Sequence, residues 1–260
     1  MELIFIFLVA VVASALTFFS GFGLGTILLP VFAIFLPITT AVATTAIVHL
    51  VNNLFKFIIT YKAINWSITL LFGIPAIIAA LVGAITLARL DTQTVISNWQ
   101  ALGVSGEITL IGFTIGVVII IFAIFELFSN FKTIAISNRW LPLGGLLSGF
   151  FGGLSGNQGA LRSAFLIKTA MSKEAFIATG VVIAVLVDIT RLSVYGTTFF
   201  NLELFQDSSS RLLIFSAIFG GIIGALLAKA YLPKVTFRWI QIFVAALLVM
   251  FGLAIMLGVV

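Results

Sequence analysis

Four polar side chains recur at helical spacing in a stretch of the chain that is otherwise apolar. They are separated by four, three and four positions and would line one face of a helix over residues 38–60: Thr45, His49, Asn52 and Lys56. Such a polar stripe usually lines a pathway for a polar solute. His49 is the only histidine, and its alternative roles are to bind a solute or proton and to form an interhelical hydrogen bond. No second histidine or acidic residue stands at ligand spacing, so we expect no metal site.

Arg162 is a cation among apolar neighbours such as Leu161 and Phe165. Inside a bilayer an arginine costs at least ~2.5 kcal/mol, so it needs a partner or a purpose. Its planar guanidinium suits an anionic head group such as a sulfonate or a carboxylate. The alternative is a structural ion pair with Asp188 or Glu126.

Asp188 and Arg191 stand one turn apart on a second polar helix, over residues 174–196. The simplest interpretation is that they neutralise each other. The alternative is that Asp188 carries a proton, while Lys56 and Arg191 act as cationic vestibules on the two sides of a site.

Two glycine-rich breaks interrupt apolar runs and complete the set of groups that could do chemistry. Residues 20–25 read SGFGLG and residues 155–159 read SGNQG. A helix that restarts after each break would point unpaired N–H groups and a positive dipole end at the same place, which suits an anion. Close helix packing is the alternative, and it is our interpretation of the pair Gly220 and Gly224.

The two breaks belong to an internal repeat. A shift of 135 positions places Ser20 on Ser155, Asn53 on Asp188 and Lys56 on Arg191. Paired interruptions at corresponding places in two halves point to the binding site of a secondary transporter. Irregular backbone is tolerated at membrane depth only where protein or a wet cavity covers it.

Composition places the whole chain in a membrane. Of its 260 residues 62% are hydrophobic and 8% charged, where a soluble domain has about 25% charged residues. The net charge is +5, and the basic residues that produce it lie between apolar spans. This distribution indicates a bias set by membrane topology rather than nucleic-acid binding. The chain has no cysteine and no hydrolytic or nucleotide-binding motif, so we expect neither an enzyme nor a cofactor.

Apolar spans alternate with short polar connections along the chain. We predict them at 3–19, 26–36, 38–60, 67–88, 107–128, 141–151, 159–169, 174–196, 212–231 and 239–258. The short spans form two pairs around the breaks, and each pair is either one broken crossing or a hairpin.

Lysine and arginine decide between these topologies. With hairpins, nine cations face one side: Lys56, Lys62, Lys132, Arg139, Lys168, Lys173, Lys229, Lys234 and Arg238. Three face the other side, namely Arg89, Arg191 and Arg211, whereas single crossings would split the same residues six to six. Because cations mark the cytoplasm, we predict hairpins and two extracytoplasmic termini.

The predicted fold is an all-α integral membrane protein with two inverted-topology repeats. Each repeat has a re-entrant or broken helical hairpin plus three transmembrane helices. The repeats cover residues 1–128 and 141–260, joined by a cytoplasmic connection at 129–140, and residues 89–106 form an outer loop. A homo-oligomer in membrane lipid is compatible with this plan.

Three motifs follow one another in order and together span nearly the whole chain: residues 20–25 followed by Pro30, residues 61–66 (YKAINW) and residues 152–159 (GGLSGNQG). In these motifs and their order the chain resembles the TauE/SafE family of sulfite and organosulfonate exporters. The resemblance implies an exporter of the bacterial inner membrane for sulfite or a small sulfonated or carboxylated anion. The halves differ, with Arg162 opposite Ile27 and Ala184 opposite His49, so the implied site is asymmetric.

Our hypothesis from the sequence is a secondary transporter that exports a small anion by alternating access between the hairpin tips. The candidate substrate-binding residues are Ser20, Gly21, Phe22, Gly23, Thr45, His49, Asn52, Asn53, Ser155, Gly156, Asn157, Gln158, Gly159 and Arg162. The candidate gating or coupling residues are Lys56, Asp188 and Arg191. Proton coupling is optional, and the alternatives are a passive anion channel, an importer of a small organic anion and a non-transporting scaffold.

Overall fold

Helices dominate the part of the chain that the structure describes. The computed structural model describes residues 1–20, 23–90, 93–101, 103–127, 138–198, 208–231 and 238–259. The α-helices are α1 (Glu2–Ser20), α2 (Leu24–Ala33), α3 (Ile38–Thr60), α4 (Trp66–Arg89), α5 (Leu110–Leu127), α6 (Leu141–Ser155), α7 (Gly159–Leu166), α8 (Lys173–Thr198), α10 (Ser208–Tyr231) and α11 (Arg238–Met256). Short 3₁₀ turns, η1 (Tyr61–Ala63) and η3 (Asn138–Trp140), precede α4 and α6. Each span predicted from the sequence overlaps one of these helices.

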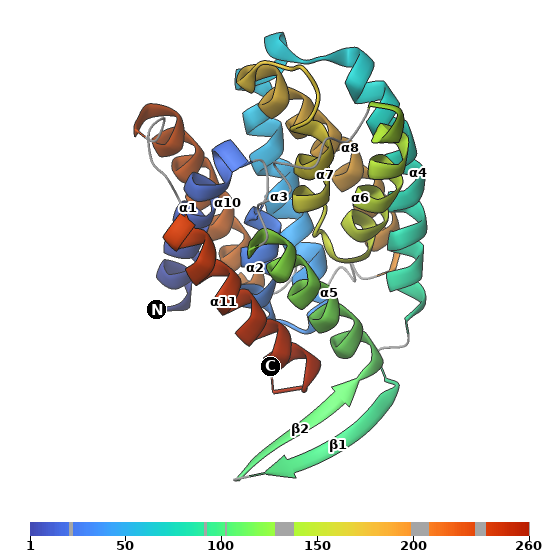
Figure 1. The fold of residues 1–260 in the computed structure, drawn as a ribbon. Helices are drawn as coiled ribbons and strands as arrows, with labels where there is room; N and C mark the ends of the chain where they lie inside the picture. The colour runs from blue at the N-terminus through green and yellow to red at the C-terminus, as the bar shows by residue number, and fades with distance from the viewer. Residues whose placement is uncertain are drawn as a thin grey trace.

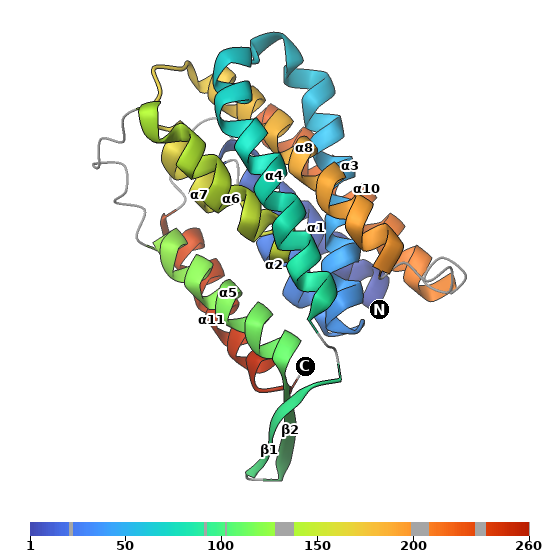
Figure 2. The same ribbon diagram turned by 90° about the vertical axis from the view of Figure 1, so that its right-hand side faces the viewer.

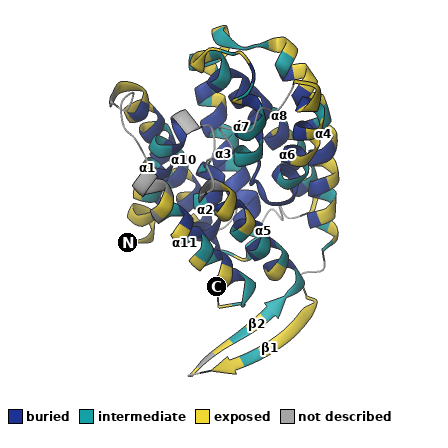
Figure 3. Ribbon diagram, in the orientation of Figure 1, coloured by how far each residue is buried: buried dark blue, intermediate teal, exposed yellow. Residues whose placement is uncertain are grey.

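Within the described residues, four helices are long and apolar enough to cross a membrane, namely α3, α4, α8 and α10. In contrast α2 has 10 residues and α7 has 8, which at 1.5 Å per residue cannot span ~30 Å of hydrocarbon. The outer faces of α4 and α10 expose large apolar side chains such as Ile74, Ile78, Phe215 and Phe219 (Figure 3). Apolar faces of this extent are unfavourable in water, whereas in a membrane lipid tails cover them. The protein is therefore an integral membrane protein.

The two helices that carry the polar residues, α3 and α8, pack against each other at the centre. Their most apolar segments are 56% and 61% buried, against 44% for α4 and α10. α4 packs on α8 and α6, while α10 packs on α3 and α1. α5 and α11 form a further pair beside this group, as Figures 1 and 2 show.

Both short helices lie beside the helix that precedes them in the chain. α7 packs against α6 and α2 packs against α1. The two termini lie at one end of the molecule, and η1 lies at the opposite end, where α4 begins (Figure 1).

Glycines let the helices of the two halves approach closely. A Cβ on Gly145, Gly149 or Gly153 of α6 would overlap backbone atoms of α4, and one on Gly220 or Gly224 of α10 would overlap carbonyl oxygens of α1. Close backbone approach at small residues is the main way helices associate without a hydrophobic driving force. The interpretation of Gly220 and Gly224 as packing residues agrees with these contacts.

The outer loop expected at 89–106 instead contains a β-hairpin, so the fold is not wholly α-helical. β1 (Val95–Ala101) pairs antiparallel with β2 (Val104–Thr109), and Ala101 lies opposite Val104. Gly103 supplies the positive φ of +80° that a two-residue hairpin turn needs. The indole N–H of Trp99 donates to the carbonyl of Leu257, 2.8 Å away, and ties the hairpin to the end of α11. Because the strands extend to Thr109, α5 begins at Leu110 rather than at 107.

The contact between α4 and α6 predicts a steric effect on stability. Gly149→Ala should lower the free energy of unfolding by about 1–3 kcal/mol, the usual cost of overpacking, because the new methyl group meets the Ala76 carbonyl. The matched control is Gly73→Ala on α4, whose methyl group would have its nearest neighbours at 3.8 Å. Unfolding of both variants in detergent tests this, and equal stability of the two would contradict the close contact.

Candidate functional site

The two glycine-rich breaks lie together, beside the polar face of α3. Gly23 begins α2 with φ of +110° and Gly156 ends α6 with φ of +83°, both in the left-handed region that favours glycine. A Cβ on Gly25 would lie 3.5 Å from the Gly156 carbonyl oxygen and 3.7 Å from His49 Cδ2. Residues far apart in the sequence therefore converge here. Gly21, Phe22 and the side chain of Ser20 lie outside the described residues.

The buried carboxylate of Asp188 is the hub of the hydrogen bonds at this point. Oδ2 lies 2.6 Å from His49 Nδ1 and accepts from the Asn53 amide at 3.3 Å. Oδ1 accepts from Arg191 Nε at 3.0 Å and from the Gln158 amide at 3.4 Å. Arg191 Nη2 adds a charge contact at 2.8 Å without hydrogen-bond geometry. Both structural alternatives considered from the sequence are therefore present. Asp188 and Arg191 form an ion pair, and His49 forms an interhelical hydrogen bond with Asp188.

Arg162 joins this network through a side-chain amide. Its Nη1 donates to Gln158 Oε1 at 3.2 Å, while the other end of the same amide donates to Asp188. Gln158 is held in place because its backbone carbonyl accepts a hydrogen bond from Ser148 Oγ at 2.9 Å. The second break therefore positions Arg162 relative to Asp188.

The remaining residues of the second break bond among themselves. The Asn157 amide donates to Ser155 Oγ at 3.1 Å, and Asn157 Oδ1 is buried without a hydrogen-bond partner among the described residues. Gly156 packs under the Arg191 guanidinium, so a side chain at position 156 would displace it. α7 starts at Gly159 with no side-chain cap, and α2 likewise has none, which leaves first-turn N–H groups for another acceptor.

A small central cavity lies beside the network and is lined by side chains of both halves. It has about 20 Å³ of space, room for roughly one water molecule. Its lining is Thr17, Phe18, Leu24, His49, Asn53, Lys56, Arg162, Ile177 and Val181. We call it the central cavity. Lys56 is 5% exposed, and its Nζ lies 5.5 Å from the centre of the Phe18 ring.

A wider pocket of about 710 Å³, here called the vestibule, opens at the end of the molecule that carries η1. Three lysines and one glutamate line it: Lys62, Lys173, Lys229 and Glu174. Phe18 and Ile177 line both the vestibule and the central cavity. The two spaces therefore adjoin at these residues.

The candidate residues divide into three groups by position. His49, Asn53, Lys56 and Arg162 line the central cavity, and Gln158, Asp188 and Arg191 bond behind them. Thr45 lies near Gly25 with its buried hydroxyl unpaired within the described residues. Asn52 turns away to Ser14 of α1, at 2.8 Å, and does not line the central cavity.

Sequence reasoning missed several residues of the site. Phe18 and Ile177 are apolar residues in apolar helices and give no sequence signal. Tyr195 could have been found, since it follows Asp188 and Arg191 at helical spacing; its hydroxyl donates to the Gly153 carbonyl.

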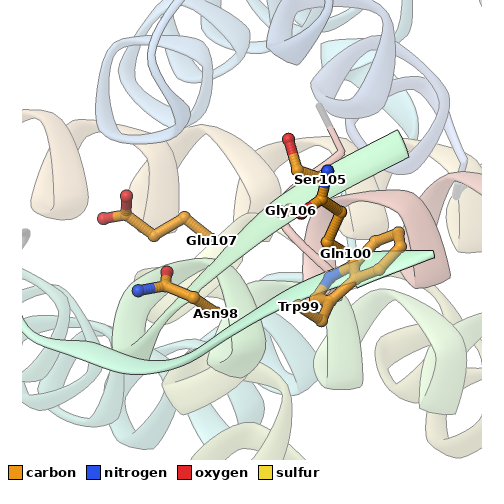
Figure 4. A pocket seen from close by; sticks show the side chains of 7 residues that line it. Asn98, Trp99, Gln100, Ser105, Gly106 and Glu107 are labelled. Carbon is orange, nitrogen blue, oxygen red and sulfur yellow. The ribbon is translucent and has the colours of Figure 1, made fainter. Parts of the chain in front are cut away.

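A pocket of about 590 Å³ at the β-hairpin has different chemistry (Figure 4). Its lining includes Asn98, Trp99 and Gln100, and Glu107 is the only charged side chain among the described residues that line it. A negative lining does not suit an anion, so we assign no anion site there.

An apolar helical bundle with a buried, cationic and amide-rich cavity defines a membrane transport protein for a polar solute. Residues 6–256 match the family described as Sulfite exporter TauE/SafE, and the chain belongs to that family. The family comprises membrane transporters of sulfite or related anions. No curated protein and no solved structure matches the chain significantly.

The Asp188 network predicts a large effect of charge removal. Asp188→Asn should destabilise the protein by about 3–5 kcal/mol, because it leaves the Arg191 guanidinium buried without its countercharge. Combining it with Arg191→Met should recover part of that loss. Unfolding of the wild type, both single variants and the double variant in detergent measures the coupling. Additive losses would contradict a direct interaction.

Proposed function

We propose that the protein is a secondary transporter that exports a small anion, sulfite or an organosulfonate, by alternating access. The observation that carries the proposal is the central cavity, where Lys56 and Arg162 meet His49 and Asn53 beside the two breaks. Ammonium, guanidinium and amide groups are the donors that bind oxyanions. Uncapped first turns of α2 and α7 add backbone donors nearby.

The direction of transport follows from charge. An inside-negative membrane potential favours the exit of an anion by ~2.3 kcal/mol per charge per 100 mV. A uniporter would therefore suffice. Coupling to a proton at His49 or Asp188 is optional. These two side chains are already hydrogen-bonded to each other.

The arrangement of helices supports two inverted repeats, 1–128 and 141–260, with a hairpin in each. α6 of the second half packs on α4 of the first, and α1 of the first packs on α10 of the second. Such an exchange of partners is what a pseudo-two-fold axis produces. Each short helix lies beside its predecessor, as a hairpin requires.

The distribution of cations supports an orientation in the inner membrane. The vestibule lysines lie at the end with η1, opposite the termini, so that end would be cytoplasmic and both termini extracytoplasmic. The vestibule would then collect anions from the cytoplasm.

The two sides of the site are closed to different degrees. On the vestibule side, Phe18 and Ile177 alone line both spaces. On the other side, Arg191 is fully buried, and Tyr195 bonds to the Gly153 carbonyl. This asymmetry favours a gated transporter in a state closer to inward-facing.

A passive channel or an importer would use the same donors. Saturation and counterflow in proteoliposomes support a transporter, whereas conductance without counterflow supports a channel. The direction of net flux under an imposed potential separates export from import.

The anion site predicts a ligand effect that depends on Arg162. Sulfite or an organosulfonate at 100 times its Kd should stabilise the wild type by about 2.7 kcal/mol, and Arg162→Ala should abolish this stabilisation. Thermal unfolding in detergent with and without anion measures it. Arg162→Lys tests whether the fork geometry is needed. The control is Arg211→Gln, which removes an exposed cation at the start of α10. Stabilisation that persists in Arg162→Ala would contradict the site.

The hairpin topology predicts which residues share a side of the membrane. Because the chain has no cysteine, single cysteines can be labelled without background. Cysteines at Glu2 and Pro37 should react with an impermeant thiol reagent from the outside, and one at Lys62 from the inside. Labelling of positions 2 and 37 from opposite sides would exclude the first hairpin.

A further inference from the structure

We infer that Lys56 makes the site selective for anions with two negative charges. This inference rests on the proposed function and names the charge class of its substrate. The argument uses the buried charges, their partners and an internal comparison between the two halves.

The buried charges of the described residues do not balance. With Lys56 protonated and His49 neutral, the buried side chains Lys56, Arg162 and Arg191 carry three positive charges against one negative charge on Asp188, a net of +2. Uncompensated charge in a membrane interior is costly. An anion that carries two charges restores neutrality, whereas one that carries a single charge does not.

The second half of the chain compensates its own cation. Arg191 stands three positions after Asp188 and contacts its carboxylate at 2.8 Å. At the corresponding positions of the first half, Lys56 stands three positions after Asn53, which is an uncharged amide. The repeat therefore places a cation at both positions but supplies a carboxylate in one half only.

The surroundings of Lys56 supply no countercharge among the described residues. Lys56 takes part neither in the Asp188–Arg191 ion pair nor in the His49–Asp188 contact. Its ammonium lies over the Phe18 ring, a contact that attracts a cation but carries no net charge. Lys56 therefore lines the central cavity as a cation whose charge an anionic ligand can neutralise.

Lys56 and Arg162 together can divide the charges of one ligand. They come from α3 and α7, one from each half, and line the same cavity. A guanidinium binds two oxygens through its planar fork, and an ammonium binds as a point charge. The cavity has room for about one water molecule, which is less than an oxyanion needs. For an oxyanion to bind, Phe18 must therefore move. The anion then takes the place of the Phe18 ring beside Lys56.

Pairs of anions that differ in charge but little in size test the inference. The probes are sulfate against methanesulfonate and sulfoacetate against its carboxamide, sulfoacetamide, each added to purified wild type at constant ionic strength. Affinities are measured by thermal shift and by competition with transport in proteoliposomes. We expect the wild type to prefer the dianion of each pair.

Three variants locate the preference. Lys56→Gln should reduce the ratio of dianion to monoanion affinity by about 30-fold or more, as expected for truncating one partner of a buried charge pair. Lys56→Arg should keep the ratio. Arg211→Gln, which removes an exposed positive charge, should leave the ratio unchanged and so controls for net charge.

The outcomes separate the inference from the proposed function. Equal affinity of the wild type for dianions and monoanions, or an unchanged ratio in Lys56→Gln, overturns the charge selection and leaves anion transport standing. Such a result would mean that Lys56 carries no proton in the site. Failure of every anion to bind or cross with the wild type overturns the proposed function itself. The wild-type ratio needs no variant, so a Lys56→Gln protein that does not fold cannot rescue the inference.

Discussion

The Asp188 carboxylate is the group on which the centre of the molecule depends. It lies fully buried between α3 and α8, where an unpaired carboxylate would be prohibitively costly. Its neighbours come from three places, namely His49 and Asn53 of α3, Arg191 of α8 and Gln158 of the second break. Satisfying this one charge therefore fixes how the two central helices and the break lie relative to one another.

Residues related by the internal repeat meet at this centre. Asn53 and Asp188 are 135 positions apart and lie 3.3 Å from each other, as expected for residues near a pseudo-two-fold axis. One turn further along each helix stand Lys56, which lines the central cavity, and Arg191, which contacts Asp188. The replacement of an acid by an amide at one of the two axial positions makes the halves chemically unequal. That inequality leaves Arg191 in an ion pair and Lys56 on the cavity.

The sequence predicts the helices of this fold well because hydropathy and length determine them directly. It also predicts that His49 and Lys56 share a helix face, and both line the central cavity. That the breaks carry chemistry stays a prediction. The sequence does not predict that the Asn52 side chain bonds to Ser14. The polar stripe of α3 is wide, and only the packing of α1 against it determines which residue Asn52 contacts. The β-hairpin was missed because Val95–Ala101 alternates weakly, with Val95 and Ile96 both exposed. Phe18 is invisible for a different reason, as an apolar residue acquires a role only from the cavities that it lines.

Under the proposed alternating access, the two closures of the site would use equivalent parts of the chain. Phe18 borders the central cavity on the vestibule side, and the position 135 residues later is Gly153, whose carbonyl accepts from Tyr195 on the other side. In one half the closing contact is an aromatic ring beneath an ammonium, and in the other it is a hydrogen bond to a backbone carbonyl beside a guanidinium. Under the proposed alternating access, an anion that binds Lys56 competes with the Phe18 ring for the same charge. Occupancy of the site would then weaken one closure without touching the other, which gives the substrate a direct means of changing the side to which the cavity opens.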